Sequence, residues 1–363
     1  MKAQLSQQDL LKAVQIVQRS VSPRSTLPIL SGILFETGDS KITLSATDLE
    51  IAMRTEFPAK IKSQGKVVIP AKLIGDVIRN LPDKDLIINE VNKEEIEVVC
   101  EQAHFNLKTL NLDDFPKFPT PHPTKSWTLK KESFLEGIKQ VVTAASRDET
   151  RPILTGVLLI INEGRLRMVA TDSYRLALRD EKLNTETNEN LKVIVPSRSI
   201  EELAKIIPLA TTDIKIGIAQ NQIVFNLGET ILVSRLIEGD YPSYEQLIPK
   251  SHEVKMEVSR EILMKAVRRA SILAQNTPLR LSLEEGRLKI SAQTSGLGQA
   301  EEVLDVKKKG ENLEIAFNPQ YLIDGLSGIK GETVFLELVS PLKPGFLRGE
   351  KEDFRSLIMP VRL

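Results

Sequence analysis

The segment Leu27-Pro28-Ile29-Leu30 recurs 124 residues later as Arg151-Pro152-Ile153-Leu154, and in weaker form after a further 126 residues as Thr277-Pro278-Leu279. A second motif repeats with nearly the same period, as Val68-Ile69-Pro70-Ala71, Ile194-Val195-Pro196-Ser197 and Phe317-Asn318-Pro319-Gln320. The period is about a third of the 363-residue chain. It is too long for a solenoid repeat of roughly 20–50 residues and matches the size of a globular domain. The sequence therefore predicts one domain that is built three times.

Each repeat is predicted to contain two amphipathic helices among about eight strands. The first helix is expected over residues 7–20, 131–145 and 260–274, and the second over residues 71–81, 198–207 and 320–329. The second helix begins just after the repeated proline, and proline is well tolerated in the first turn of a helix because the missing N–H has no helical partner there. The pattern predicts an α+β fold with the helices on one face of the sheet.

Prolines mark the domain boundaries. Pro116, Pro119, Pro121 and Pro123 predict a stiff, extended linker after the first domain. The second boundary is expected near Pro249-Lys250-Ser251-His252. The motif Asp114-Phe115-Pro116 recurs as Asp240-Tyr241-Pro242. We expect domains at residues 1–118, 127–246 and 252–363.

Composition indicates a folded cytoplasmic protein. Hydrophobic residues make up 41% of the chain and charged residues 27%, which is ordinary for a globular protein. No signal peptide is expected, and no apolar stretch approaches the roughly 18 residues of a membrane-spanning helix. The single cysteine, Cys100, cannot form an intrachain disulfide, which is typical of a reducing compartment. Its valine neighbours predict that it is a small buried hydrophobe in a strand.

The expected helices carry a net positive charge, although the net charge of the whole chain is zero. The chain has 49 basic and 49 acidic residues. The spans that hold the six expected helices nevertheless carry +6 together, so the remainder carries −6; these spans are residues 6–20, 71–81, 131–147, 198–208, 259–272 and 319–330. On the helix around Ala266, an apolar arc is expected to include Ile262, with Lys265, Arg268 and Arg269 on the opposite side. For any one helix, a solvated charged face is the simpler interpretation. Four of the six helices carry a net positive charge and none carries a net negative charge, which favours a shared basic surface.

Motifs for catalysis and metal binding are absent from the sequence. There is no phosphate-binding Gly-rich loop and no nucleophile elbow. The three histidines are too far apart in sequence for a metal-ligand pattern. Thr47-Asp48 recurs as Thr171-Asp172, and we interpret the repeated aspartate as part of a repeated backbone structure rather than as a general base. No enzymatic activity and no cofactor are expected.

Several segments resemble the bacterial sliding clamp, the β subunit of DNA polymerase III. They are Thr26-Leu27-Pro28-Ile29-Leu30, Thr47-Asp48-Leu49-Glu50, Ala170-Thr171-Asp172-Ser173-Tyr174-Arg175-Leu176-Ala177 and Met359-Pro360-Val361-Arg362-Leu363. The resemblance covers the whole chain in order. It implies three clamp domains per protomer and a head-to-tail homodimeric ring with helices lining the hole. It also implies that the ring encircles duplex DNA, tethers the polymerase III α subunit and other clamp-motif proteins, and is opened by a clamp loader.

The resemblance also implies functional residues. A pocket for partner peptides with a Gln and a Leu-Phe-like pair would be formed by Leu154, Thr171, Ser173, Tyr174, Arg175, Leu176, Pro242, Leu247, Asn318, Tyr321, Leu342, Met359, Pro360, Val361 and Arg362. DNA-facing residues that match the family are Arg24, Lys72, Arg151 and Arg198, and the helix pattern adds Arg147, Lys265, Arg268 and Arg269. The dimer interface would include Phe105, Ile272 and Leu273.

Simple geometry agrees with a ring. Twelve helices spaced about 10 Å apart enclose an opening of about 28 Å, which admits a DNA duplex. A neutral chain binds DNA weakly by counterion release, whereas a closed ring is retained by topology. Two alternatives remain: an enzyme with scattered site residues, and a DNA-binding scaffold that does not encircle DNA.

Overall fold

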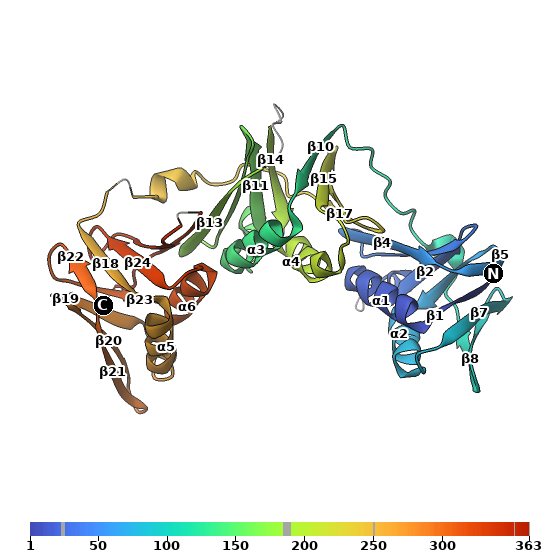
Figure 1. Cartoon of the computed structure of the whole chain (residues 1–363), viewed down its shortest axis with the longest axis horizontal. Coiled ribbons are helices and arrows are strands. Elements are labelled where there is room, and N and C mark those ends of the chain that lie inside the picture. Colours follow the sequence, from blue (N-terminus) through green and yellow to red (C-terminus); the bar gives the residue numbers. More distant parts are fainter. Residues whose placement is uncertain (23–25, 184–189, 250, 352, 363) are drawn as a thin grey trace. The chain divides into compact units, whose positions relative to one another are not determined.

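The computed structural model describes residues 1–22, 26–183, 190–249, 251–351 and 353–362 (Figure 1). The chain forms two compact units. The first contains residues 1–131 and 202–236, and the second contains residues 132–201 and 237–363. The middle third of the chain therefore contributes to both units. We describe each unit by itself.

The first unit contains two helices of the first repeat and strands from the first and middle repeats. The helices are α1 (Gln7–Val17) and α2 (Ala71–Asn80). The strands of the first repeat are β1 (Lys2–Ser6), β2 (Gly32–Thr37), β3 (Lys41–Thr47), β4 (Ile51–Pro58), β5 (Lys60–Ser63), β6 (Lys66–Pro70), β7 (Asp85–Asn92), β8 (Glu95–Cys100) and β9 (Ala103–Lys108). The strands of the middle repeat are β10 (Lys125–Leu129), β15 (Ile214–Ala219), β16 (Gln222–Asn226) and β17 (Thr230–Arg235).

Two antiparallel sheets form this unit. One has the order β5-β1-β7-β8-β9, and the other has the order β10-β15-β16-β17-β4-β3-β2-β6. The larger sheet passes from the middle repeat to the first repeat where β17 pairs with β4, with Thr230 opposite Thr55. The hydroxyls of these two buried threonines lie 2.8 Å apart. The joint between the repeats is therefore a continuous hydrogen-bonded sheet.

The second unit also consists of two antiparallel sheets and the helices that pack on them. Its helices are α3 (Lys131–Val141), α4 (Ser197–Ile206), α5 (Arg260–Ser271) and α6 (Pro319–Gly328), and the boundary between the units falls inside α4. The strands of the middle repeat are β11 (Gly156–Asn162), β12 (Arg165–Thr171), β13 (Arg175–Lys182) and β14 (Leu191–Pro196). The strands of the last repeat are β18 (Val254–Ser259), β19 (Leu279–Glu284), β20 (Arg287–Thr294), β21 (Gly298–Asp305), β22 (Lys307–Lys309), β23 (Leu313–Phe317), β24 (Thr333–Leu338), β25 (Gly345–Gly349) and β26 (Phe354–Ile358).

A nine-stranded sheet joins the middle and last repeats in the order β14-β11-β12-β13-β26-β25-β24-β18-β22. The joint is the pairing of β13 with β26, in which Leu176 is opposite Leu357. The remaining sheet has the order β21-β20-β19-β23. Together with the helices, these antiparallel sheets confirm the expected α+β class.

The repeated Pro-Ile-Leu segments adopt the same local structure. Pro28–Ser31 and Pro152–Thr155 each form a single 3-10 turn. A glycine follows each turn, and a side chain there would clash, because a Cβ on Gly32 would lie 2.5 Å from Val68 and one on Gly156 would lie 2.4 Å from Ile194. Pro278 instead precedes a strand, β19, which accounts for the weaker third copy of the motif.

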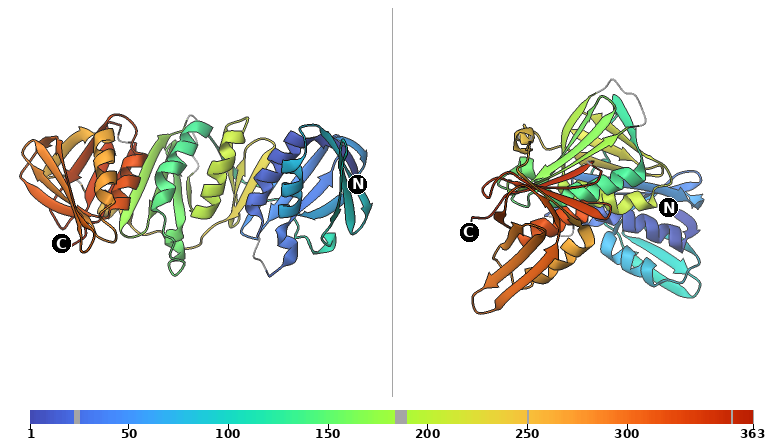
Figure 2. Two further views of the ribbon diagram at one scale, coloured as in Figure 1. Left: turned by 90° about the horizontal axis from the view of Figure 1, so that it is seen from below. Right: turned by 60° about the vertical axis from the view of Figure 1, so that its left-hand side comes forward.

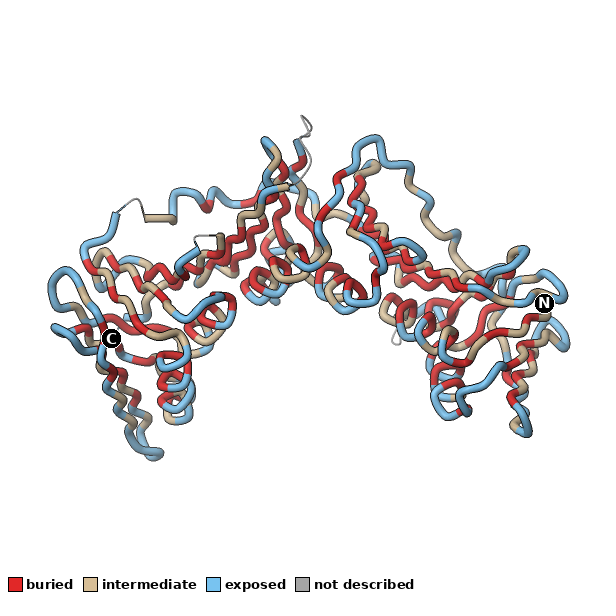
Figure 3. Tube along the Cα trace, in the orientation of Figure 1, coloured by how far each residue is buried: buried red, intermediate tan, exposed pale blue. Residues whose placement is uncertain are grey.

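The helices pack in pairs on the sheets. In the first unit α1 contacts α2, β3 and β4, and in the second unit α5 contacts α6, β20 and β21 (Figure 2). The buried side chains lie between these layers, and each unit has its own buried interior (Figure 3). The expected helix positions are confirmed to within a few residues.

The expected apolar face of α5 is wrong at one residue. Ile262 is 53% exposed, whereas Met264 is 8% exposed and belongs to the core. The buried arc is centred near Leu263 and Ala270. Ile262 and Met264 lie at opposite edges of this arc at 100° per residue, so only the packing against the sheet decides which one is buried.

The first linker is not a free spacer. Phe118 packs on Ala52 and Val233 in the large sheet of the first unit, and the guanidinium of Arg54 lies 4.0 Å from the centre of its ring. Cys100 is buried, as expected. No helix among the described residues is long and apolar enough to cross a membrane.

Candidate peptide pocket and nucleic-acid surface

The turn between β12 and β13 forms one wall of the predicted pocket. The Asp172 carboxylate accepts hydrogen bonds from the backbone N–H groups of Tyr174 (2.9 Å) and Arg175 (3.0 Å). The Thr171 hydroxyl donates to the carbonyl oxygen of Arg175 (2.6 Å). These bonds hold Ser173 at φ = 78°, a conformation that is uncommon for residues other than glycine.

The same turn exists in the first repeat. The Asp48 carboxylate accepts from the backbone N–H groups of Glu50 (3.0 Å) and Ile51 (2.8 Å), and Leu49 has φ = 77°. This confirms the interpretation of the repeated Thr-Asp pair as duplicated backbone structure. Each aspartate builds a turn.

The side chain of Arg175 connects the turn to the last repeat. Its side chain is only 14% exposed and donates to Asp172 (3.0 Å), to Asp324 on α6 and to the carbonyl oxygen of Thr143. The guanidinium also lies 4.5 Å from the ring centre of Tyr321. Two carboxylates and an aromatic face stabilise one half-buried cation, so the position of the turn depends on Arg175.

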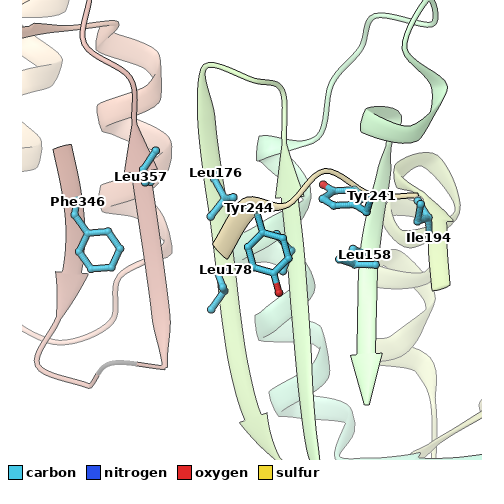
Figure 4. Close-up of a cluster of buried hydrophobic side chains, with 9 residues drawn as sticks. Leu158, Leu176, Leu178, Ile194, Tyr241, Tyr244, Phe346 and Leu357 are labelled. Carbon is cyan, nitrogen blue, oxygen red and sulfur yellow. The ribbon is translucent and has the colours of Figure 1, made fainter. Parts of the chain in front are cut away.

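An apolar cluster lies beneath the turn, across the β13–β26 joint (Figure 4). Leu176 and Leu178 on β13 lie near Tyr244, while Leu357 and Phe346 come from the neighbouring strands β26 and β25 (Figure 4). Tyr241 also comes from the segment that precedes the second linker, and its burial raises the pKa of its hydroxyl. The segment after Asp240 is therefore packed into the second unit.

The C-terminal segment is hydrogen-bonded to the turn that contains Asp172. The backbone N–H of Met359 donates to the carbonyl oxygen of Tyr174 (2.8 Å), and that of Val361 donates to the carbonyl oxygen of Ala316 (2.8 Å). Met359 also packs on the apolar cluster. The chain end is thus attached to the Asp172 turn and to the last repeat at once.

The predicted pocket residues all belong to the second unit, but their exposure differs. Buried members are Leu154, Thr171 and Leu176. Half-buried members are Arg175, Asn318, Tyr321, Met359 and Pro360. Exposed members are Ser173, Tyr174, Pro242, Leu247, Leu342, Val361 and Arg362.

Leu176 and Arg362 do not behave as simple pocket residues. Leu176 is 2% exposed and is part of the apolar cluster, so its side chain belongs to the core and does not present a surface to a bound peptide. Arg362 lines a separate, larger depression over β19, β20 and β21. The exposed apolar surface is supplied by Tyr174, Leu247, Leu342 and Val361, which are 60%, 47%, 70% and 41% exposed.

The described DNA-facing candidates are all exposed: Lys72, Arg147, Arg151, Arg198, Lys265, Arg268 and Arg269. Arg24 lies outside the described residues. Some of these cations already have anionic partners: Lys265 pairs with Glu261 (2.5 Å), and Arg269 makes two bonds to Glu302 (2.7 and 2.8 Å). Arg151 pairs with Asp148 and also donates to the Ser173 hydroxyl (3.0 Å), which places it beside the Asp172 turn.

The residues that are predicted to form the dimer interface lie on an edge strand and just after a helix. Phe105 is 38% exposed on β9, an edge strand, and Ile272 is 67% exposed just after α5. Leu273 is half-buried. The structure adds two exposed apolar residues that the sequence did not single out, Leu297 and Val303, in and next to the edge strand β21.

Two features of the candidate site, the Arg175 contacts and the pairing of β13 with β26, could not be predicted from the sequence. The hydrogen bond from Arg175 to Asp324 joins residues 149 positions apart, and the residues paired between β13 and β26 are farther apart still. The spacing of Tyr241 and Tyr244 was a usable signal, because Phe115 and Phe118 have the same spacing and both pack on apolar clusters of the first unit.

The chain is similar to a known family over its whole length. The sequence pattern of the DNA polymerase III beta subunit matches in three parts: the N-terminal domain at residues 1–119, the central domain at 128–243 and the C-terminal domain at 245–362. The beta sliding clamp of Staphylococcus aureus is 33% identical over 357 residues, which cover 95% of this chain and 94% of that protein.

Solved structures agree. The DNA polymerase sliding clamp of Bacillus subtilis is 30% identical with a TM-score of 0.96, and the match covers 100% of this chain and 99% of that one. The Pseudomonas aeruginosa sliding clamp bound to griselimycin is 30% identical with a TM-score of 0.95, over 100% of both chains. The chain belongs to the DNA polymerase III beta subunit family, the bacterial sliding clamps.

Proposed function

We propose that two copies of this chain form a head-to-tail ring that encircles duplex DNA and tethers the replicative polymerase. The protein is a non-catalytic processivity factor of the sliding clamp family. The observation that supports the ring best is the way the repeats are joined. Both joints between repeats within the chain are antiparallel strand pairings, β4 with β17 and β13 with β26. The same kind of strand pairing between the first repeat of one protomer and the last repeat of its partner would join two chains into a ring.

Two edge strands are suited to that pairing. Among the described residues, β9 pairs only with β8, and β21 pairs only with β20. Such edges are templates for another strand. β9 carries Lys108 and His104, whereas β21 carries Glu301, Glu302 and Asp305. Opposite charge would favour β9 of one protomer against β21 of its partner, with Phe105, Ile272 and Leu273 at the apolar centre.

The basic helix residues are proposed to face the DNA. Lys72, Arg147, Arg198, Lys265, Arg268 and Arg269 lie on helices or next to them, and Arg24 and Arg151 match the family. A net charge of zero is compatible with sliding, because retention comes from ring closure and not from many phosphate contacts.

The pocket in the second unit is proposed to bind peptide tails of the polymerase III α subunit, the clamp loader and other clamp-motif proteins. Its exposed apolar residues suit a short motif with two or three hydrophobic anchors. We further propose domains at residues 1–118, 127–246 and 252–363, and a cytoplasmic location.

Retention on circular DNA tests this function. The protein is loaded by its clamp loader on a nicked circular plasmid, and half of the sample is then linearised. We expect the complex to survive moderate salt on the circle and to be lost from free ends. Equal retention on both forms would contradict encirclement and favour a DNA-binding scaffold.

A further inference from the structure

A cavity lies within the first unit, where the first and middle repeats join. Its volume is about 150 Å³. Its described lining comes from the end of β3, the turn that contains Asp48, the start of β4, residues 116–119 and the strands β16 and β17. None of these lining residues is among the predicted DNA-binding, pocket or interface residues. An apolar cavity of roughly 150 Å³ holds a benzene ring, so there is room for one aliphatic side chain.

By internal repetition, this cavity is the counterpart of the predicted peptide pocket. Ala52 and Leu176 are 124 residues apart, which is the offset of the repeated Pro-Ile-Leu motif. Ala52 is opposite Val233 across the β4–β17 joint, and Leu176 is opposite Leu357 across the β13–β26 joint. The two joints therefore have the same strand register.

A backbone hydrogen bond beside each joint supports the correspondence. The N–H of Arg235 donates to the carbonyl oxygen of Glu50 (3.0 Å), and the N–H of Met359 donates to the carbonyl oxygen of Tyr174 (2.8 Å). Met359 and Tyr174 are predicted pocket residues of the second unit. Their counterparts, Arg235 and Glu50, both line the cavity of the first unit.

The two sites differ in charge at corresponding positions. Arg235 stands where the second unit has Met359, and the repeated Asp-aromatic-Pro motif places Lys117 where the second unit has Ser243. Arg235 and Lys117 are exposed, and neither has an anionic partner among the residues that the structure describes. Glu50 is the only carboxylate of the described lining, so the lining has an excess of one positive charge.

Leu49 supplies an exposed apolar group to the same cavity. Its side chain is 47% exposed, and its backbone has φ = 77°, a conformation that is uncommon for a bulky residue. The N–H of Leu49 donates to the Thr47 hydroxyl (3.0 Å), which holds this conformation. The counterpart of Leu49 in the second unit is the polar residue Ser173. A large aliphatic side chain that is both strained and exposed indicates a contact outside the protomer.

We propose that this cavity is a second peptide site, which binds an extended segment of a partner protein with one aliphatic side chain beside an acidic residue. The aliphatic side chain packs on Leu49, Ala52 and Val233. The acidic side chain accepts charge-assisted hydrogen bonds from Lys117 and Arg235. The Gln and Leu-Phe motif expected in the second unit has no such acid, so the two sites bind different peptide segments.

Peptide binding to the intact protein tests the proposal. Three fluorescent peptides have the same Gly-Ser flanks and differ only at their centres, which are Asp-Leu-Asp, Asn-Leu-Asn and Asp-Gly-Asp. We expect the wild type to bind the Asp-Leu-Asp peptide at least about fivefold more tightly than either of the others, because only this peptide combines the aliphatic anchor with the charge. Fluorescence anisotropy measures the three affinities.

Two variants separate the contributions. In Lys117→Gln combined with Arg235→Gln, the preference for aspartate over asparagine should fall below about twofold, while the preference for leucine over glycine remains. In Leu49→Asn, the preference for leucine over glycine should fall instead, and asparagine tolerates the positive φ of this position. The matched control, Lys60→Gln with Leu209→Asn, changes exposed residues of the first unit outside the cavity and should retain both preferences.

Further measurements locate the bound peptide. The variant Leu247→Asp, Leu342→Asp in the second unit should bind the Asp-Leu-Asp peptide as the wild type does, and an excess of a peptide with a Gln and a Leu-Phe pair should not displace it. Equal binding of the three centres, or no binding, overturns the inference, and so does displacement by the Gln and Leu-Phe peptide or by short duplex DNA. Binding of the Gln and Leu-Phe peptide to the second unit is measured in parallel, so failure of the second site is distinguishable from failure of the proposed function.

Discussion

The Arg175 guanidinium lies 4.5 Å from the ring centre of Tyr321, which joins the turn beside the predicted pocket to the first turn of α6. Asn318 caps the same helix by accepting from the backbone N–H of Gln320 (2.8 Å). Asn318 and Tyr321 are predicted pocket residues at the start of α6. Arg175, a third predicted pocket residue, lies on β13, and its side chain connects that strand to the start of α6.

Arg175→Met should loosen the Asp172 turn and lower stability. The substitution leaves the carboxylates of Asp172 and Asp324 without their shared cation, and loss of one partner of a buried ion pair costs about 3 kcal/mol. Thermal unfolding should shift to lower temperature, and peptide affinity should fall with it. Arg287→Met removes an exposed arginine and should change stability by less than about 0.5 kcal/mol. An unshifted transition for Arg175→Met would show that the network contributes little.

Ile272→Ala combined with Leu273→Ala should weaken the dimer. Ile272 is 67% exposed in the single chain, so the protomer fold does not depend on it. Loss of both aliphatic side chains at an interface should cost about 3 kcal/mol and raise the dimer Kd by more than about 100-fold. Sedimentation velocity across a concentration series measures this change.

Ile262→Ala is the matched control for the dimer. It removes another exposed isoleucine of α5, at the opposite end of the helix, and should leave the dimer unchanged. A wild-type protein that is monomeric at micromolar concentration would contradict the closed ring.

Glu181→Gln should flatten the dependence of stability on pH. Burial raises the pKa of Glu181, with Ser133 and Arg179 opposing the shift, and one carboxylate oxygen has no hydrogen-bond partner among the residues that the structure describes. The folded state therefore binds more protons than the unfolded state above the ordinary pKa of 4.5, so this group makes stability fall as pH rises through that window.

Thermal unfolding at pH 4 and pH 7 measures the effect. The variant should gain stability over the wild type at pH 7 and lose that advantage at pH 4. Glu285→Gln, at an exposed turn position, should keep the wild-type slope. A Glu181→Gln variant that is less stable than wild type at pH 7 would mean that the ionised carboxylate is stabilising through Arg179.

The combination of Lys72→Glu, Arg147→Glu and Arg268→Glu should lower DNA loading. All three residues are exposed and lie on helices or just after one. Reversal of their charge replaces three positive charges per protomer with three negative ones near the phosphates, which changes the net charge of the protomer by −6. Loading on nicked circles at low salt should drop by about tenfold or more. The control variant, Lys60→Glu with Arg287→Glu and Lys309→Glu, changes the net charge equally at exposed strand positions. Equal losses in both variants would mean that net charge matters and the helix faces do not.

The local parts of this fold were predictable from the sequence. The second proline motif predicted where the second helix of each repeat begins, and helical periodicity predicted where the first helix lies. Each of these depends on residues close together in the chain, whose backbone preferences act locally. Ile262 and Met264 show the limit, since periodicity placed both at the edge of the buried arc and only the packed sheet separates them.

The candidate site was predictable only in part. The resemblance supplied its residues, but not that Leu176 is in the core while Leu342 is 70% exposed. The opposition of Leu176 and Leu357 across the β13–β26 joint depends on strand register, which is set by long-range pairing and turn geometry. No local pattern near either leucine indicates this pairing.

Leu247→Asp combined with Leu342→Asp is the sharpest test of the peptide pocket. A charge at Leu176 would be a poor test, because that side chain is 2% exposed and an ionised group there would disrupt the core. Leu247 and Leu342 are 47% and 70% exposed, so carboxylates at these positions remain solvated and the fold should persist. They would face the hydrophobic anchors of a bound peptide, which has micromolar affinity, about −8 kcal/mol, if it behaves as a short motif.

We expect the double variant to bind a peptide with a Gln and a Leu-Phe pair at least about 30-fold more weakly than wild type, or about 2 kcal/mol. Fluorescence anisotropy measures the affinity, and sedimentation confirms that the variant remains a dimer. Leu209→Asp, at another exposed leucine in the first unit (54% exposed), controls for an added carboxylate and should bind normally. Unchanged peptide affinity in a folded Leu247→Asp, Leu342→Asp dimer would place the binding site elsewhere on the protein, because a hydrophobic anchor that contacts either position would lose affinity when a carboxylate replaces the leucine.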